Sequence, residues 1–215
     1  MFFKDRWQAG ELLAKKLFGY RGGTPLILAV PRGGLPVALL LWRELGGELD
    51  LLITRKIGAP TQPELAIGAV AGDGYLLLND ALVERLHLPA GYLEHSCARE
   101  RAEIKRRLKL YRGRRAPPVI AGRRVILVDD GVATGFTLRA ALQEIRRQHP
   151  RELVLAIPVG PPETLRDLAE EVDKIYFLEA PSNFTAVGQF YEDFRQVEDR
   201  EVIAILREAW NEDGE

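Results

Sequence analysis

The chain has 215 residues, which favours one substantial α/β domain with a full core over two small domains. Lysine and arginine total 30 against 31 aspartates and glutamates, a formal net charge of -1, so no global charge recruits nucleic acid or an anionic membrane. A single cysteine, Cys97, excludes an internal disulfide framework. We find no signal-peptide pattern and no run of about 18 apolar residues that would span a membrane. We therefore expect a cytoplasmic protein.

Hydrophobic periodicity predicts the order of helices and strands in the first half of the chain. Residues 4–20 have the apolar spacing of an amphipathic helix. A buried strand at 25–30, a Pro/Gly turn leading into a helix at 31–46, and a second strand at 48–58 then form one βαβ unit. Residues 64–80 read as two short strands joined around Asp73 and Gly74, because Asp-Gly favours a tight hairpin turn.

The second half of the chain alternates helices with aliphatic strands. Two helical segments follow the hairpin, and the strands at 124–130, 152–160 and 173–179 are separated by helices at 137–149 and 163–172. This alternation favours a doubly wound parallel sheet. We expect a single domain over 1–215, with a core at 20–180, a hairpin and helical insertion at 64–115, and a C-terminal extension at 180–215.

The segment VILVDDGVATGFT, residues 125–137, places two adjacent aspartates where a buried strand ends and a glycine-rich loop begins. In open α/β sheets, ligands bind at the carboxyl ends of the strands. The loop leads into a helix, so free backbone N–H groups and the positive end of the helix dipole favour a phosphate. Two carboxylates would repel that phosphate unless they serve sugar hydroxyls, a divalent cation or a developing positive charge.

Simpler and rival interpretations exist for this segment. Each residue alone fits an ordinary strand-exit turn followed by a helix cap, but the whole run does not favour that explanation. A P-loop nucleotide-binding protein would need the pattern G-x-x-x-x-G-K-[ST], which occurs nowhere in the chain. A dinucleotide-binding fold would need G-x-G-x-x-G after a strand, which is also missing.

The segment resembles the phosphoribosyl-pyrophosphate (PRPP) motif of type I phosphoribosyltransferases, and the match spans nearly the whole chain, as in an uncharacterised bacterial branch of that family. The resemblance implies a Rossmann-like core and places Asp129 and Asp130 against the ribose hydroxyls as the catalytic pair. It also implies that the loop binds the 5-phosphate through Gly131, Val132, Ala133, Thr134, Gly135, Phe136 and Thr137.

Two further segments follow core strands and carry charge. Arg32, Gly33 and Gly34 resemble the family's pyrophosphate loop, although a simple strand-to-helix turn explains them equally well. Arg55 and Lys56 lie at the carboxyl edge of the second strand, where a basic residue often approaches pyrophosphate in this family. A pair of solvated cations is the alternative for them.

The acceptor is the least defined part of the site. Among Phe184, Phe190 and Tyr191, which follow the last core strand, Phe184 is the stacking candidate, and Asn183 beside it could read a base edge. Core packing is the alternative for Phe184. The basic stretch 99–115 could suggest RNA binding, but we favour a solvated helix face with pairs such as Glu103 and Arg107.

The function that we expect from these features is Mg²⁺-dependent transfer of the phosphoribosyl group of PRPP to a nitrogen acceptor such as a nucleobase. No protein ligand is assigned to the metal, which PRPP would mainly hold near Asp129 and Asp130. The alternative is a regulatory protein that binds PRPP without turnover. We expect no nucleic-acid or membrane partner, and a homo-oligomer stays open.

Overall fold

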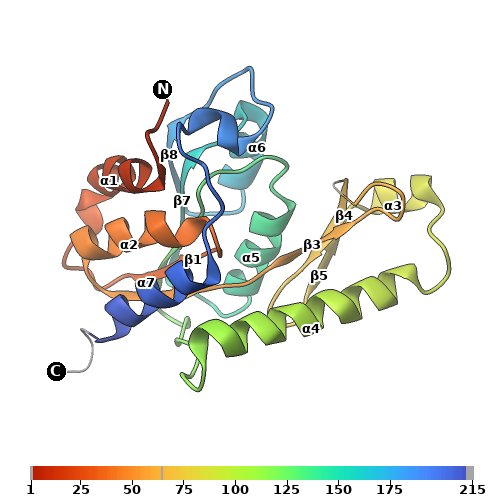
Figure 1. Ribbon diagram of the computed structural model, residues 1–215, viewed down its shortest axis with the longest axis horizontal. Helices are drawn as coiled ribbons and strands as arrows, with labels where there is room; N and C mark the ends of the chain where they lie inside the picture. Colours follow the sequence, from red (N-terminus) through yellow and green to blue (C-terminus); the bar gives the residue numbers. More distant parts are fainter. Residues whose placement is uncertain (1, 64, 212–215) are drawn as a thin grey trace. The chain divides into compact units, whose positions relative to one another are not determined.

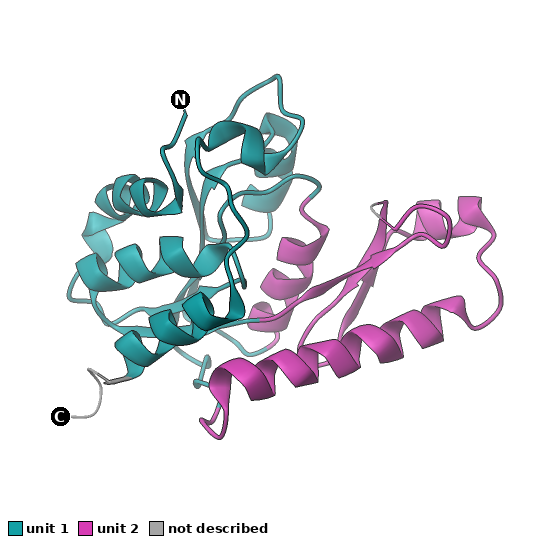
Figure 2. Ribbon diagram, viewed as in Figure 1, with its two compact units in different colours: residues 1–52, 117–134, 148–215 teal, residues 53–116, 135–147 magenta. Residues whose placement is uncertain are grey.

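The computed structural model describes residues 2–63 and 65–211, which divide into two compact units (Figure 2). Unit 1 comprises residues 1–52, 117–134 and 148–215, and unit 2 comprises residues 53–116 and 135–147. Each unit has its own sheet and its own apolar core. The domain boundaries expected from the sequence stay a prediction.

Unit 1 is built on a five-stranded parallel sheet in the order β2-β1-β6-β7-β8 (Figure 1). Its strands are β1 (Leu26–Ala29), β2 (Glu48–Leu51), β6 (Arg124–Val128), β7 (Glu152–Val159) and β8 (Lys174–Glu179). All four residues of β1 are buried, as are seven of the eight residues of β7, because parallel strands are covered on both faces. The α/β fold with a parallel central sheet, expected from the sequence, is confirmed.

Helices that pack against the sheet and against one another complete unit 1. They are α1 (Arg6–Lys16), α2 (Gly34–Leu45), α6 (Pro162–Ala169) and α7 (Asp199–Asn211), with short 3-10 turns η1 (Phe18–Tyr20) and η2 (Val187–Phe190). Helix α2 is apolar over most of its surface and packs between α1 and α7 as well as against β1. Asp5 caps α1, since its side chain accepts a hydrogen bond from the Gln8 backbone N–H at 2.9 Å.

Unit 2 has a three-stranded antiparallel sheet made of β3 (Arg55–Gly58), β4 (Ala66–Val70) and β5 (Leu76–Leu78). The hairpin predicted around Asp73 is therefore present as β4 and β5. Three helices accompany this sheet: α3 (Asp80–Leu86), α4 (Tyr92–Arg112) and α5 (Phe136–Arg146). Helix α5 contacts all three strands, and α4 contacts β3 and β4.

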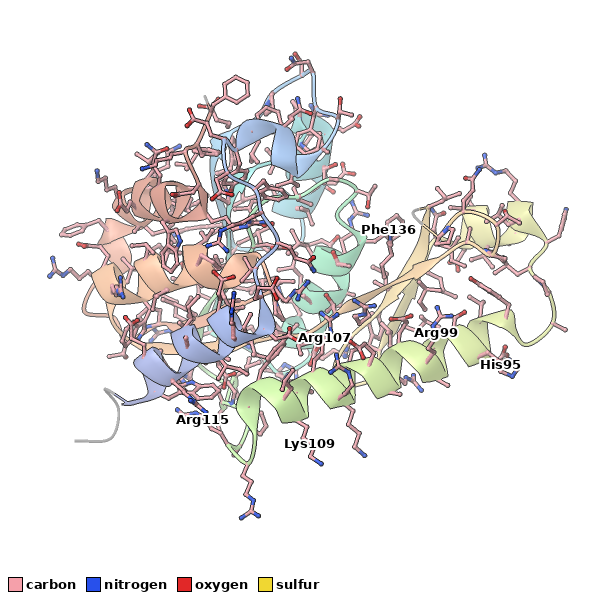
Figure 3. The ribbon with its side chains drawn as sticks, viewed as in Figure 1. His95, Arg99, Arg107, Lys109, Arg115 and Phe136 are labelled. Atoms are coloured by element: carbon pink, nitrogen blue, oxygen red, sulfur yellow. The ribbon has the colours of Figure 1, made fainter. Side chains whose placement is uncertain are left out.

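Helix α4 carries most of the basic stretch. Figure 3 shows His95, Arg99, Arg107 and Lys109 spread along the length of this helix. The expected pair is present, because Arg107 Nε donates to Glu103 Oε1 at 2.6 Å, and Arg106 Nε donates to the same carboxylate at 2.7 Å. No helix in the described part of the chain is long and apolar enough to cross a membrane.

The single strand expected over 48–58 is wrong, because the chain forms two strands there. Strand β2 pairs in parallel with β1 up to Leu51, and β3 starts antiparallel pairing with β4 at Arg55. The connection between them includes Leu52 and Ile53, which are both buried. Apolar residues thus continue through the change of sheet, so the hydrophobic pattern gives no signal of it.

Candidate functional site

The central sheet of unit 1 has a topological switch point between β1 and β6. These strands are parallel neighbours, with β2 beyond β1 on one side and β7 beyond β6 on the other. Ligands of open α/β sheets bind at the carboxyl ends of the strands beside such a point. The segments that begin there are residues 30–34 after β1 and residues 129–134 after β6.

Two glycines after β1 bring these segments into contact. A Cβ atom on Gly33 would lie 1.9 Å from Asp130 Oδ2, and one on Gly34 would lie 3.1 Å from the Asp129 Cα atom. Only residues without side chains leave room for the aspartates at this distance. The predicted pyrophosphate loop and the predicted catalytic pair are therefore packed against each other.

The two aspartates are held in place by the local backbone and differ in their partners. The Asp130 backbone N–H donates to Asp129 Oδ1 at 2.8 Å. Burial and the adjacent charge of Asp130 raise the pKa of Asp129 well above its usual range. Burial also raises the pKa of Asp130, and the nearby Arg6 guanidinium partly offsets that rise.

The cation beside Asp130 comes from the start of the chain. Arg6, the first residue of α1, donates from Nε to Asp130 Oδ2 at 2.7 Å. Tyr191 approaches the same residue, and its hydroxyl donates to the Asp130 carbonyl oxygen at 2.6 Å. The sequence pattern predicts neither contact. Arg6 lies 124 positions away and carries no local motif, and Tyr191 is one of several aromatic residues after the last strand.

The first four residues of the predicted phosphate loop belong to unit 1. Val132 is buried, and its backbone N–H donates to the Val159 carbonyl oxygen at 2.9 Å, so this residue anchors the loop to β7. The Ala133 carbonyl oxygen accepts a hydrogen bond from Thr164 Oγ1 at 2.9 Å. Ala133 and Thr134 are exposed, while Gly131 is buried, so the middle of the loop is the part that a ligand can reach from solvent.

The last three residues of the loop belong to unit 2 and start helix α5. Gly135 caps this helix with φ 79°, a left-handed conformation that favours glycine. Phe136 packs against an apolar cluster that includes Ala69 and Ala140. The carbonyl oxygen of Thr137 accepts a hydrogen bond from Thr54 Oγ1 at 3.1 Å. The first backbone N–H groups of α5 lack intrahelical acceptors, as in any helix, and are suited to an anion.

The predicted pyrophosphate cations occupy different environments. Arg32 is half-buried and lies 3.5 Å from the Asp199 carboxylate, measured from Nη1 to Oδ1. Arg55 and Lys56 lie within strand β3 of unit 2, not in a loop after β2, because the second strand ends at Leu51. Arg55 Nε pairs with the buried Glu100 carboxylate at 2.9 Å. The assignment of Arg55 and Lys56 to pyrophosphate stays a prediction.

Phe184 and Asn183 lie in the loop between β8 and η2. Phe184 is half-buried and stacks on Phe190, with ring centroids 5.4 Å apart. Asn183 is exposed, and its carbonyl oxygen accepts a hydrogen bond from the Gln189 side chain at 2.9 Å. Gln189 thus braces this loop, and the acceptor role of Phe184 and Asn183 stays a prediction.

The chemistry of the aspartate pair fits one mode of magnesium binding. In the described part of the chain, no group of three or more histidine, cysteine, aspartate or glutamate side chains could hold a metal ion. Mg²⁺ in phosphate-handling sites is commonly held by one or two carboxylates together with substrate phosphates. Asp129 and Asp130 could supply these carboxylates, with the substrate phosphates as the other ligands.

Comparisons with known proteins identify the family. Residues 6–195 match the phosphoribosyl transferase domain, so this chain belongs to the phosphoribosyl transferase domain family. The chain is 41% identical over 207 residues to a Mycobacterium tuberculosis protein named "Putative phosphoribosyl transferase Rv0571c", covering 96% of this chain and 47% of that protein. It therefore spans about half the length of the curated relatives that it matches.

Solved structures agree on the fold. The crystal structure of TT1426 from Thermus thermophilus is 42% identical, with a TM-score of 0.81 over 97% of this chain and 99% of that chain. The structure of the AQ2163 protein from Aquifex aeolicus has a TM-score of 0.52 at 15% identity, over 85% of this chain and 78% of that chain. The second likeness shows the fold alone.

Replacing Gly33 with alanine tests the packing of Asp130 against the loop after β1. Gly33 has the right-handed helical φ of -62°, so alanine adds no backbone strain, only a Cβ atom that meets the Asp130 carboxylate. We expect Gly33→Ala to lower the free energy of unfolding by about 1 to 3 kcal/mol, the usual cost of overpacking, in urea titrations. Gly19→Ala is the control, because a Cβ atom there meets nothing within 4 Å. Equal stability of the two variants would contradict the packing.

Proposed function

We propose that this protein transfers the 5-phosphoribosyl group of PRPP to a nitrogen acceptor and releases pyrophosphate. The observation that carries the proposal is the placement of Asp129 and Asp130 at the switch point, against the Gly33–Gly34 backbone. Membership of the phosphoribosyl transferase domain family supports the same reaction. In this proposal the pyrophosphate end of PRPP binds the loop after β1, and the 5-phosphate end binds the loop after β6.

The reaction exchanges one bond at C1 of the ribose for another. A nitrogen lone pair of the acceptor forms the new C1–N bond, and the C1–O bond to pyrophosphate breaks with its electron pair leaving on oxygen. The acceptor nitrogen then loses its proton where it carries one. Because the bond to pyrophosphate weakens first, C1 becomes cation-like, and fixed negative charge nearby lowers the barrier.

The residues take roles that match their surroundings. The carboxylates of Asp129 and Asp130 contact the ribose hydroxyls and stabilise the developing charge. The leaving pyrophosphate is assigned to the loop after β1, where the Arg32 guanidinium adds positive charge. The loop from Gly131 to Thr137 holds the 5-phosphate through backbone N–H groups and the dipole of the helix that follows.

A magnesium ion would be held mainly by the pyrophosphate oxygens of PRPP, with Asp129 and Asp130 as the protein carboxylates available to it. When bound, Mg²⁺ neutralises charge on the departing pyrophosphate. The two aspartates would position PRPP and its metal together, which is a role that adjacent carboxylates can fill without further protein ligands.

A panel of acceptors tests the proposed function. Purified protein is incubated with PRPP and Mg²⁺, and pyrophosphate release is measured with each nucleobase and with water alone. We expect release above the water control with at least one nitrogen base, because turnover needs a nucleophile at C1. PRPP binding without pyrophosphate release in the presence of any base would instead indicate a regulatory protein.

The acceptor contact that we propose is stacking of a planar base on Phe184. The variant Phe184→Leu keeps apolar packing against Phe190 but removes the flat ring. We expect its KM for the acceptor to rise by about fivefold or more, since stacking in nucleic-acid-binding sites is worth about 1 to 3 kcal/mol per base. The melting temperature and the KM for PRPP should stay close to wild type. A fall in melting temperature with an unchanged acceptor KM would mean that Phe184 serves core packing alone.

A further inference from the structure

We propose that Arg6 is a positioning residue for this reaction, which holds the Asp130 carboxylate in the orientation used at C1. The inference rests on the proposed function, because it assigns Arg6 a task only through Asp130. Its starting point is the ion pair that joins the first residue of α1 to the carboxyl end of β6. Both side chains are mostly buried, with 10% and 14% of their surface exposed.

The Arg6 guanidinium is itself fixed from several directions. Its Nη1 donates to the Arg195 carbonyl oxygen at 2.9 Å, and its Cζ lies 3.9 Å from the centre of the Phe194 ring. A cation over an aromatic face is attracted by the ring electrons. Tyr191 completes the arrangement by binding the Asp130 carbonyl oxygen through its hydroxyl. The segment after η2 therefore fixes the cation and the residue that it holds.

The Asp130 carboxylate lies between Arg6 and the loop after β1. Its Oδ2 atom faces both the Arg6 Nε and the space over Gly33. The bond from Arg6 Nε fixes the orientation of this carboxylate, and without the bond the side chain could take other rotamers. Fixed charge stabilises a transition state only when it is already oriented, so loss of Arg6 should affect the chemical step more than substrate binding.

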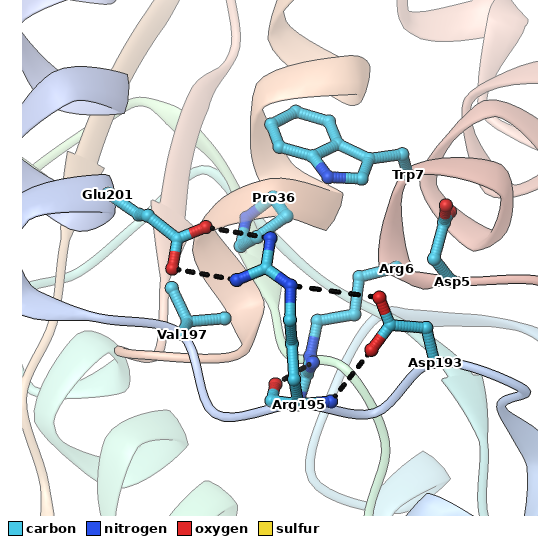
Figure 4. Close-up of a pocket in the computed structure, with 8 residues that line it drawn as sticks. All are labelled: Asp5, Arg6, Trp7, Pro36, Asp193, Arg195, Val197 and Glu201. Atoms are coloured by element: carbon cyan, nitrogen blue, oxygen red, sulfur yellow. Dashed lines mark hydrogen bonds and ion pairs between the residues drawn. The ribbon is translucent and has the colours of Figure 1, made fainter.

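A second arginine lines a small cavity beside Arg6 and offers a matched control variant. The cavity has a volume of about 120 Å³, and Figure 4 shows Arg6 and Arg195 among the residues that line it. The Arg195 side chain pairs with Glu201 at 3.1 Å, and the hydrogen bond from Arg6 goes to the Arg195 backbone carbonyl oxygen. Arg195→Gln therefore removes an arginine from the same cavity while keeping the backbone acceptor of Arg6.

The test compares Arg6→Gln, Arg6→Lys and Arg195→Gln in steady-state pyrophosphate release. We expect Arg6→Gln to lower kcat by about tenfold or more, because a misplaced Asp130 carboxylate stabilises the transition state less well, with a smaller change in the KM for PRPP. Arg6→Lys restores a cation and should recover part of the lost kcat. Arg195→Gln should keep kcat close to wild type. Equal kcat values for Arg6→Gln and Arg195→Gln would overturn the proposal.

A double-mutant cycle separates failure of this inference from failure of the proposed function. In an Asp130→Asn background, Arg6→Gln should cause little further loss of kcat, because its task runs through that carboxylate. If wild type releases no pyrophosphate with any acceptor, the proposed function and the catalytic role of Arg6 both fail. The same cycle, measured as free energies of unfolding in urea, then tests whether Arg6 holds the Asp130 side chain. Non-additive effects of the two substitutions support this contact, and additive effects overturn it.

Discussion

The site depends on one electrostatic constraint, which is that Asp129 and Asp130 place two carboxylates side by side at the end of a buried strand. Burial and mutual repulsion both disfavour this arrangement, and both raise the pKa of Asp129. Three features stabilise the pair. The Asp130 backbone N–H donates to the Asp129 carboxylate, and the Arg6 guanidinium pairs with the Asp130 carboxylate. Two glycines, Gly33 and Gly34, leave space for both side chains. A ligand with a cation-like centre would complete the charge balance.

Local elements of the fold could be predicted from the sequence where residues a few positions apart determine them. The aliphatic run before Asp129 predicts a buried parallel strand, and the glycines and threonines after it predict a loop followed by a helix. The structure has β6 and α5 at these places, one residue apart from the expected helix start at Thr137. The hairpin around Asp73 was predicted for the same reason, because its turn residues act within a few positions.

Long-range features were not predictable from local patterns. The pairing of Arg6 with Asp130 joins residues 124 positions apart, and an arginine at the start of an amphipathic helix looks like any solvated charge. The hydrophobic pattern gives no signal of the change of sheet between β2 and β3, because Leu52 and Ile53 in the connection are also buried. Gly33 and Gly34 were recognised as loop residues, but only the fold shows that the space above them belongs to the aspartates.

We propose that the loop from Gly131 to Thr137 holds the phosphate of PRPP, and calorimetric titration of two variants at Gly135 tests this role. Gly135 has a left-handed φ of 79°, so Gly135→Ala and Gly135→Asp share the backbone strain and differ in charge. Two like charges about 4 Å apart repel by about 1 kcal/mol in water and about 4 kcal/mol near a protein surface. We predict that Gly135→Asp binds PRPP about tenfold or more weakly than Gly135→Ala. Equal affinities in two folded variants would contradict the claim.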